Sequence, residues 1–365
     1  MIFNGEIKEV IDGHLHIDGC YEDDGADFLN GFDEYIEKGP FRAVCIAALP
    51  SGKKGAANRD PSNNIMAAFC KIANPKVYAF GGLTYRNYPQ DPDALGDMAL
   101  DVQYKELMDI GFDGIKMLEG KPNLYRYVGN RLDSDMFDGF FAEAEKNGTH
   151  ILMHACDPIE FWTEEYATPE YIAKGWSYVS DEYPKKEEIY AQVENILKKH
   201  PRLSLTLAHF YFMADDLCRL GALFDKYENL GVDITPGGEM YVSFEKNRDK
   251  TRDFFNKYSD RIMLGTDGSF PKCMRAMEWL ADRTYRYITT NDTFMGFEDK
   301  YQTGLLLERD AQEKILSKNF IRRVSDSPKP INKAALKKYI EKYKHLIRDE
   351  KALALVEKYS EQLLK

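Results

Sequence analysis

The chain has 365 residues, a net charge of −11 and an isoelectric point of about 5.3. This acidic balance, without a long basic run interleaved with aromatic residues, excludes a nucleic-acid surface, and no apolar run is long enough to cross a membrane. The first residues, "MIFNGEIKEV", lack the features of a secretory signal, and the six cysteines are scattered without a CxxC pair, so we expect a cytoplasmic protein with reduced thiols.

Apolar runs with strand character alternate with helical patterns along most of the chain. In chain order, the eight predicted strands are residues 8–17, 41–49, 77–85, 113–118, 150–155, 203–210, 231–235 and 261–267. The helical patterns carry end signals, with Ser134 as a predicted N-terminal cap and with Gly111 and Gly148 as predicted ends. Two further helices are predicted at 333–346 and 349–364.

This alternation predicts an α/β fold built on a parallel sheet. Eight strand–helix units over about 270 residues fit a (β/α)8 TIM barrel, and an open, doubly wound sheet is the alternative. The break "SDSPKP" precedes the last two helices. We therefore expect a barrel over residues 1–325 and a C-terminal helical extension over residues 326–365, packed on the barrel.

The first predicted strand, in "VIDGHLHIDG", ends with two histidines that are separated by one residue. Strand alternation places Asp12, His14 and His16 on one face and Leu15 on the other. In a barrel, the two histidines would then face the C-terminal mouth, where such barrels carry their chemistry. They could bind one cation, or they could be two satisfied polar residues. Asp12 is interpreted as buried support.

Three other predicted strands place a polar residue at their C-terminal end. His154 ends "HILMHA", His209 follows the apolar run in "LSLTLAHF", and Asp267 ends "RIMLGTD". Neutral imidazoles and a carboxylate suit a cation such as Zn²⁺. The three remaining histidines are expected to be surface or capping residues: His150, His200 and His345.

As a set, these motifs resemble the amidohydrolase superfamily, in its amidohydrolase-2 branch of TIM-barrel metal-dependent hydrolases. The resemblance covers residues 8–324 and is carried by "IDGHLHI", "GFDGIKML", "ILMHACDP", "LAHF", "IMLGTDGSFP" and "EKILSKNFIRRV". It implies that His14, His16, His154 and Asp267 bind one divalent metal ion, which we expect to be Zn²⁺, with Mn²⁺ as the alternative. Asp267 would also accept a proton from the activated water. His209 would be a second general acid or base or a donor to the transition state, and in some members it is a metal ligand.

Two residues of the fourth predicted strand are ambiguous. Lys116, in "GIKML", is expected to pair with a substrate carboxylate or an interior acid. Two-metal members of the superfamily use a carboxylated lysine in this strand to bridge the ions, which is the less favoured interpretation here. Glu119 is expected to be a solvated loop acid, and the alternative is a metal or substrate contact.

Loops after the predicted strands supply the remaining candidate substrate contacts. The aromatic insert of residues 161–184, which contains Trp162, is either a wall over the metal or a small packed subdomain. The segment "TPGGEMY" offers Glu239 and Tyr241 as a second wall. Arg86, in "LTYRNYP", is either a partner of a substrate carboxylate or an ordinary surface arginine.

The resemblance implies a metal-dependent hydrolase that cleaves an amide, lactone or related bond in a small carboxylated or aromatic substrate. Because the branch also contains non-oxidative decarboxylases, decarboxylation of a small aromatic or unsaturated acid is the alternative. A metal-binding barrel without catalysis is the second alternative, which the filled site positions disfavour. The expected partner is a small molecule, without nucleic acid or membrane, and the C-terminal helices offer a surface for a homodimer.

Overall fold

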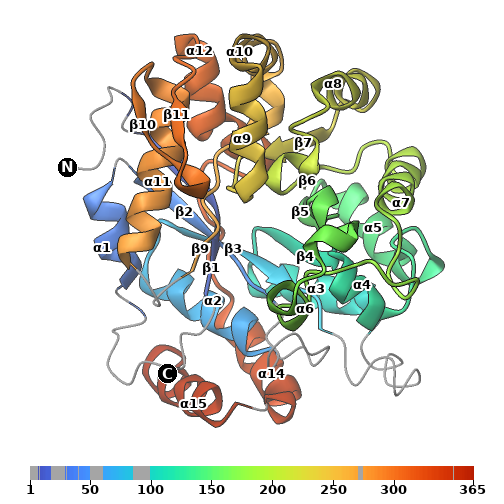
Figure 1. Ribbon diagram of the computed structural model, residues 1–365. Coiled ribbons are helices and arrows are strands. Elements are labelled where there is room, and N and C mark those ends of the chain that lie inside the picture. The colour runs from blue at the N-terminus through green and yellow to red at the C-terminus, as the bar shows by residue number, and fades with distance from the viewer. Residues whose placement is uncertain are drawn as a thin grey trace.

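A parallel sheet forms the centre of the computed structural model, which describes residues 7, 9–17, 29, 31–39, 41–49, 61–84, 99–269, 274–347 and 349–365 (Figure 1). Within these ranges, the order of its strands is β8-β7-β6-β5-β4-β3-β2-β1-β9. Their bounds are Val10–His16 (β1), Phe41–Ala47 (β2), Val77–Gly82 (β3), Gly114–Gly120 (β4), His150–Ala155 (β5), Leu205–Leu207 (β6), Leu230–Asp233 (β7), Ile262–Met263 (β8) and Gly268–Ser269 (β9). Of the eighth predicted strand, residues 261–267, only β8 is observed as a strand, and β9 begins directly after its predicted end.

The sheet closes on itself through the segment between β8 and β9. Gly13 N donates to Leu264 O at 3.1 Å, and Asp267 N donates to His14 O at 2.9 Å. β1 pairs with β2 on its other side, and β8 pairs with β7. The structure is thus the expected (β/α)8 barrel, and its eighth strand is broken in the middle.

Helices follow the strands and surround the barrel (Figure 1). Gly111 and Gly148 end two of them with φ angles of 105° and 63°, as expected, whereas the Ser134 hydroxyl makes no capping hydrogen bond. The helices with at least seven residues are Gly31–Lys38 (α1), Ser62–Ala73 (α2), Leu100–Ile110 (α3), Pro122–Val128 (α4), Asp135–Asn147 (α5), Lys186–Lys199 (α7), Leu217–Lys226 (α8), Gly238–Lys246 (α9), Arg248–Lys257 (α10), Met274–Thr289 (α11), Lys333–Tyr343 (α14) and Glu350–Leu363 (α15).

A helical segment after the barrel supports the broken strand. It runs from α12 (Arg309–Glu313) through a π-helical turn to α13 (Asn319–Arg323). Ile315 O accepts a hydrogen bond from Leu264 N at 3.0 Å, and Asn319 Nδ2 donates to Ile262 O at 2.7 Å. These contacts satisfy backbone groups that the broken strand cannot pair within the sheet.

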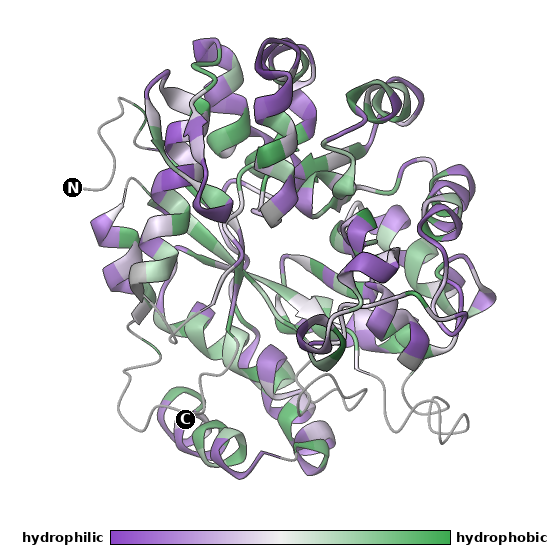
Figure 2. Ribbon diagram, viewed as in Figure 1, coloured by the Kyte–Doolittle hydropathy of each residue, from purple (hydrophilic) through white to green (hydrophobic). Residues whose placement is uncertain are grey.

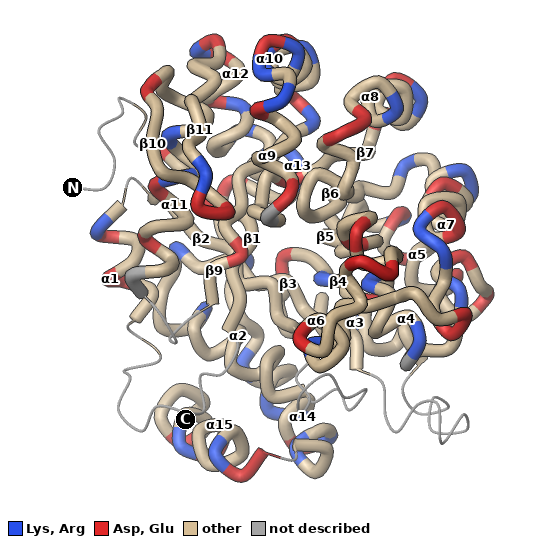
Figure 3. Tube along the Cα trace, in the orientation of Figure 1, with Lys and Arg blue, Asp and Glu red and all other residues tan. Residues whose placement is uncertain are grey.

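The apolar core has two parts, one inside the barrel and one between the strands and the helices. Figure 2 shows largely hydrophobic strands and helices that carry both hydrophobic and hydrophilic residues. Figure 3 shows charges of both signs mixed over the outer helices, in accordance with the absence of a basic face from the sequence. The inner part consists of Ile11, Ala43, Cys45, Ala47, Tyr78, Phe80, Leu152, Ala208, Met263 and Phe320.

The two C-terminal helices pack on one side of the barrel. α14 contacts α2 and α3, and α15 contacts α2. The segment that leads into α14 is fixed by hydrogen bonds from Asn332 N to Ile110 O and from Lys329 N to Asp113 Oδ1, both at 2.8 Å. The division into residues 1–325 and 326–365 stays a prediction. Within the described ranges, no helix combines the length and the apolarity that a membrane crossing requires.

Candidate active site

The two histidines of β1 lie at or after a register shift in the pairing of this strand with β2. The pairing of β1 with β2 changes register between Asp12 and Leu15. Ile11 packs inside the barrel, whereas Asp12 accepts hydrogen bonds from Tyr35 of α1 at 2.9 Å and from Thr266 at 2.7 Å. The expectation that Asp12 shares a face with the histidines is wrong, because the shift interrupts strand alternation. Its role as buried support is confirmed.

His14, His16 and Asp267 meet at the mouth of the barrel. The Nε2 atoms of the two histidines are 3.2 Å apart. Asp267 Oδ1 lies 2.8 Å from His16 Nε2 and 3.8 Å from His14 Nε2. Both histidines are buried, and the Asp267 side chain is 38% exposed. One ligand atom of each residue lies within 4.8 Å of the others, a grouping that could hold a metal ion.

Hydrogen bonds at the far side of each ring fix the tautomers of the two histidines. His14 Nδ1 lies 2.8 Å from Asp233 Oδ2 and 3.0 Å from Thr235 Oγ1, and His16 Nδ1 lies 2.7 Å from Ala47 O. A carboxylate and a carbonyl oxygen can only accept, so each Nδ1 donates and each neutral ring keeps its lone pair on Nε2. Burial lowers the pKa of His14 to about 3, which keeps this ring neutral.

The sequence reasoning overlooked Asp233, at the end of β7. Its Oδ1 accepts the backbone N–H of His209 at 2.8 Å and of Thr235 at 3.2 Å, while its Oδ2 orients His14. Burial would raise the pKa of Asp233, but the contacts with His14 outweigh burial and hold the pKa below its ordinary value. A polar residue at the C-terminal end of a strand was the signal used for His154, and "GVDIT" shows the same signal.

Lys116 and Glu119, both in β4, are buried, and Lys116 contacts His14. Lys116 Nζ lies 2.8 Å from His14 Nε2, and burial lowers the pKa of this amine to about 8. Glu119 is only 1% exposed, so the expectation of a solvated loop acid is wrong. The charge of Glu119 favours the protonated amine of Lys116, although Glu119 does not line the cavity.

His154 lines the same cavity but is not one of the three converging residues. Its Nε2 lies 2.9 Å from Cys156 O and 3.2 Å from Asp157 Oδ1, so Nε2 donates and the lone pair lies on Nδ1. Lys121 Nζ forms an ion pair with Asp157 at 2.6 Å. Burial would raise the pKa of Asp157, but Lys121 and His154 together hold it well below its ordinary value.

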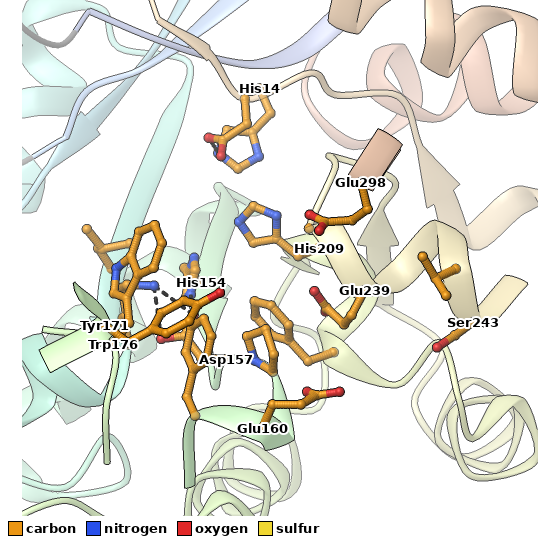
Figure 4. A pocket seen from close by; sticks show the side chains of 18 of the residues that line it. His14, His154, Asp157, Glu160, Tyr171, Trp176, His209, Glu239, Ser243 and Glu298 are labelled. Carbon is orange, nitrogen blue, oxygen red and sulfur yellow. Dashed lines mark hydrogen bonds and ion pairs between the residues drawn. The ribbon is translucent and has the colours of Figure 1, made fainter. Parts of the chain in front are cut away.

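His209 follows β6 in an uncommon backbone conformation. Residues 209–212 all have positive φ angles, between 50° and 58°. Its Nδ1 lies 3.2 Å from Thr235 O, which leaves the lone pair on Nε2, and its ring centroid lies 4.9 Å from that of His154. Burial lowers the pKa of His209 to about 4. The turn after β6 therefore presents a neutral imidazole between His14 and the outer cavity (Figure 4).

Asp267 also has a left-handed backbone, with a φ of 59°. This conformation lies in the gap between β8 and β9, where it directs the side chain toward His16. Burial would raise the pKa of this carboxyl, but the surrounding imidazoles of His16, His209 and His14 hold it well below its ordinary value. Asp267 is thus an ionised carboxylate that reaches the cavity.

A cavity of about 700 Å³ is lined at its inner end by His14, His16, Lys116, His154, His209 and Asp267. Its outer part is lined by the 161–184 insert, α9 and the turn between β10 (Thr293–Met295) and β11 (Tyr301–Thr303). Figure 4 shows Tyr171 and Trp176 on one side of His154 and His209, and Glu160, Glu239 and Glu298 on the other.

Two expected substrate contacts do not line this cavity. Trp162 packs against Tyr178 at a ring distance of 4.9 Å, and its Nε1 donates to Pro184 O. Tyr241 is buried and donates to Ile234 O, because α9 turns this side chain toward the core. Glu239 lines the cavity, and Arg86 lies outside the described residues. The insert is both a packed unit and a cavity wall.

The histidines outside the site were only partly anticipated. His150 was expected at the surface or in a cap, but it is buried at the start of β5, where its Nδ1 lies 2.8 Å from Ser204 Oγ. His200 takes the expected capping position after α7, although it is buried. His345 is exposed, as expected.

The donor set fits a divalent cation. The Nε2 lone pairs of His14 and His16 lie 3.2 Å apart, and the ionised carboxylate of Asp267 lies 2.8 Å from His16 Nε2. Three acceptors this close repel one another unless a cation lies between them. Lys116 supplies one positive charge beside His14, but its amine cannot satisfy all three acceptors. Imidazole nitrogens and a carboxylate oxygen are ligands that Zn²⁺ and similar ions accept, and the carbonyl or carboxylate behind each ring is the usual support for such ligands.

Known proteins with the same fold resemble this chain. A family model described as Amidohydrolase matches residues 11–322. An uncharacterized TIM-barrel protein from Bordetella bronchiseptica is 14% identical, covers 86% of this chain and 98% of its own, and has a TM-score of 0.52. The 5-carboxyvanillate decarboxylase of Novosphingobium aromaticivorans was solved with manganese and 4-hydroxy-3-methoxy-5-nitrobenzoic acid. It is 12% identical, the match covers 88% of this chain and 98% of that protein, and the TM-score is 0.51.

A third structure, the IDCase of Metarhizium anisopliae in its apo form, is 13% identical, covers 86% of this chain and 96% of its own, and has a TM-score of 0.50. No curated protein matches the chain. The structural likenesses support the TIM-barrel fold, and the family match extends over the whole barrel, from β1 to α13. The chain therefore belongs to the amidohydrolase family.

Proposed function

We propose that this protein is a metal-dependent hydrolase that cleaves an amide, lactone or related bond in a small carboxylated or aromatic substrate. The observation that supports this proposal is the convergence of two oriented imidazoles and one ionised carboxylate on a cavity of about 700 Å³. His14, His16 and Asp267 would hold the ion, and His154 would contribute its free Nδ1 lone pair. The cavity is large enough for a small organic substrate.

The residues divide the work of hydrolysis between them. A bound divalent ion would polarise the substrate carbonyl and bring the pKa of water to about 7. Asp267 is ionised and partly exposed, so it can accept a proton from the attacking water and return it to the leaving group. His209, fixed through Nδ1, can interact with the developing oxyanion from its Nε2 side, and Lys116 adds positive charge nearby.

Zn²⁺ is the proposed ion, because imidazole and carboxylate ligands suit it, and Mn²⁺ is the alternative. The Novosphingobium decarboxylase, which shares the fold, was solved with manganese. Metal content of protein purified without chelators, followed by titration of the stripped protein, tests this step. A second ion bridged by a carboxylated Lys116 is the less favoured alternative, and a metal-to-protein ratio near two would support it.

Decarboxylation is the second candidate function, favoured by that same Novosphingobium enzyme. A panel of small carboxylates, lactones and amides separates the candidates, because decarboxylation releases CO₂ and hydrolysis releases an acid. CO₂ release without acid release would reject the hydrolase. A protein that takes up no divalent ion would reject both, and one that takes up an ion without turnover on a broad panel would favour the metal-binding barrel.

Asp267→Asn tests the role of the carboxylate. Asparagine tolerates the left-handed backbone of this position well, so the fold should be preserved. We expect turnover to fall by at least about 100-fold, because the amide cannot accept the proton. Asp253→Asn, on the exposed side of α10, is the matched control. Turnover near the wild-type value in Asp267→Asn would contradict the assigned role.

A further inference from the structure

The cavity is lined by two glutamates that form no ion pair among the described residues. Among the charged groups of its inner wall, Lys121 is paired with Asp157 and Lys116 contacts His14. Glu160 and Glu239 also line the cavity, yet neither forms an ion pair with any residue that the structure describes. Glu160 Oε2 is a buried atom without a hydrogen-bond partner. Glu239 accepts a hydrogen bond from its own backbone N–H, and no cationic side chain in the described part of the chain pairs with either acid.

The charge of Glu160 acts on the Glu239 carboxyl. Burial raises the pKa of Glu239 to about 7, and the negative charge of Glu160 contributes to this increase. The charge of Lys186 acts in the opposite direction and is the weaker influence. An uncompensated pair of half-buried acids costs folding free energy, so its position in a cavity beside candidate catalytic groups indicates a use in binding.

An aromatic wall lines the same cavity. The Phe161 and Trp176 rings are almost parallel, with centroids 5.8 Å apart, and the Tyr171 centroid lies 5.6 Å from that of Phe161. A cation already sits against this group, since Lys174 Nζ lies 5.1 Å from the Trp176 centroid and 5.8 Å from the Tyr171 centroid. Aromatic faces together with carboxylates are the groups that bind organic ammonium ions.

We propose that the outer cavity is a subsite for a positively charged nitrogen, such as an alkylammonium group, on a small apolar or aromatic body. Glu160 and Glu239 would accept its N–H groups, and Phe161, Tyr171 and Trp176 would contact the body of the molecule. In Figure 4, Glu160 and Glu239 lie on the far side of His209 from His14. The substrate would therefore carry its ammonium group at the end opposite the scissile bond, an assignment of polarity that rests on the proposed function.

Binding of benzylamine and benzyl alcohol to the metal-loaded full-length protein tests the subsite directly. The two probes share a ring, and only benzylamine carries a positive charge at neutral pH. We expect benzylamine to bind about tenfold more tightly, which corresponds to one charge-assisted contact. Glu160→Gln and Glu239→Gln should each weaken benzylamine binding, and the double variant should bind both probes equally. Glu164→Gln, on the exposed side of the same insert, is the matched control and should behave as wild type.

Equal affinity of the wild-type protein for both probes would overturn the proposal, as would a preference for benzylamine that survives in the double variant. A second pair of probes separates this outcome from failure of the proposed function. 4-(Aminomethyl)benzoate adds a carboxylate for the metal end, and 4-methylbenzoate lacks the amine. If the metal ion does not strengthen the binding of these two carboxylates, the result counts against the proposed hydrolase alone. The preference for the amine is measured independently of the metal ion. Thermal unfolding of each variant confirms that it is folded.

Discussion

Asp233→Asn is the sharpest test of how the fold prepares the metal site. The carboxylate of Asp233 uses Oδ1 for two backbone N–H groups and Oδ2 for His14 Nδ1. An asparagine at this position can keep its carbonyl oxygen on the backbone, which then turns its NH₂ group toward His14. A donor at that place favours the other tautomer of the ring, with the proton on Nε2, and a protonated Nε2 cannot bind a metal ion.

The expected loss is moderate, because His14 Nδ1 can still donate to Thr235 Oγ1 at 3.0 Å. Substitution of a supporting residue of this kind weakens metal binding by about 10- to 100-fold, or about 1.4–2.8 kcal/mol. We expect this weakening for Zn²⁺ in a chelator competition titration. In parallel, nitrogen NMR of the metal-free protein should show the His14 proton moving from Nδ1 toward Nε2.

Two controls accompany this experiment. Thr235→Val removes the minor acceptor and leaves Asp233 in place, so its affinity for Zn²⁺ should fall less than that of Asp233→Asn. Asp253→Asn, an exposed residue of α10, should have no effect. Zn²⁺ affinity of Asp233→Asn within about twofold of wild type would refute the orientation argument, and so would an unchanged His14 tautomer.

Three further predictions concern stability, measured by urea unfolding. As the pH rises from 4 to 8, the unfolding free energy of Glu239→Gln should increase by about 1–3 kcal/mol relative to that of wild type. The folded-state pKa of Glu239, about 7, lies above the ordinary 4.5, so the wild-type protein loses stability as the pH rises through this interval. A difference between the two proteins that is constant with pH would contradict this prediction. Phe320→Ala should cost about 3–5 kcal/mol, because the ring stacks on Phe80 and contacts Tyr78 inside the barrel, and a loss below 1 kcal/mol would show that this packing is unimportant. Asn319→Ala should cost about 1–3 kcal/mol, and Asn319→Asp should cost more, because a carboxylate would face two carbonyl oxygens; the reverse order would contradict the assigned contacts.

Strand alternation and the position of polar residues predicted much of the barrel and its mouth. His14, His16 and Asp267 converge because parallel strands of a barrel all end at one face, a rule that needs no knowledge of packing. The same rule applied to "GVDIT" would have found Asp233, so that omission was avoidable. Glu119 was placed in solvent because β4 extends two residues beyond its predicted end.

Other features depend on contacts between segments that are far apart in sequence. The faces of β1 could not be assigned from alternation alone, because the register shift between Asp12 and Leu15 depends on pairing with β2. Contacts within the folded protein also determine which aromatic residues of the 161–184 insert face the cavity. Trp162 turns inward to Pro184 O and Tyr178, whereas Trp176 lines the cavity, and the local sequence gives no sign of this difference.

Backbone strain at the strand ends explains why the site needs the rest of the fold. Left-handed conformations follow β5 at Cys156, follow β6 at residues 209–212, and separate β8 from β9 at Asp267. Such conformations cost about 1–2 kcal/mol for each residue other than glycine, and aromatic residues adopt them rarely. Those after β6 are held by contacts from outside the turn. Phe210 stacks on Phe255 at 5.4 Å, and Tyr190 of α7 donates to the carbonyls of residues 211 and 212 at 3.1 Å. Contacts with the outer helices therefore stabilise the turn that places His209 in the mouth of the barrel.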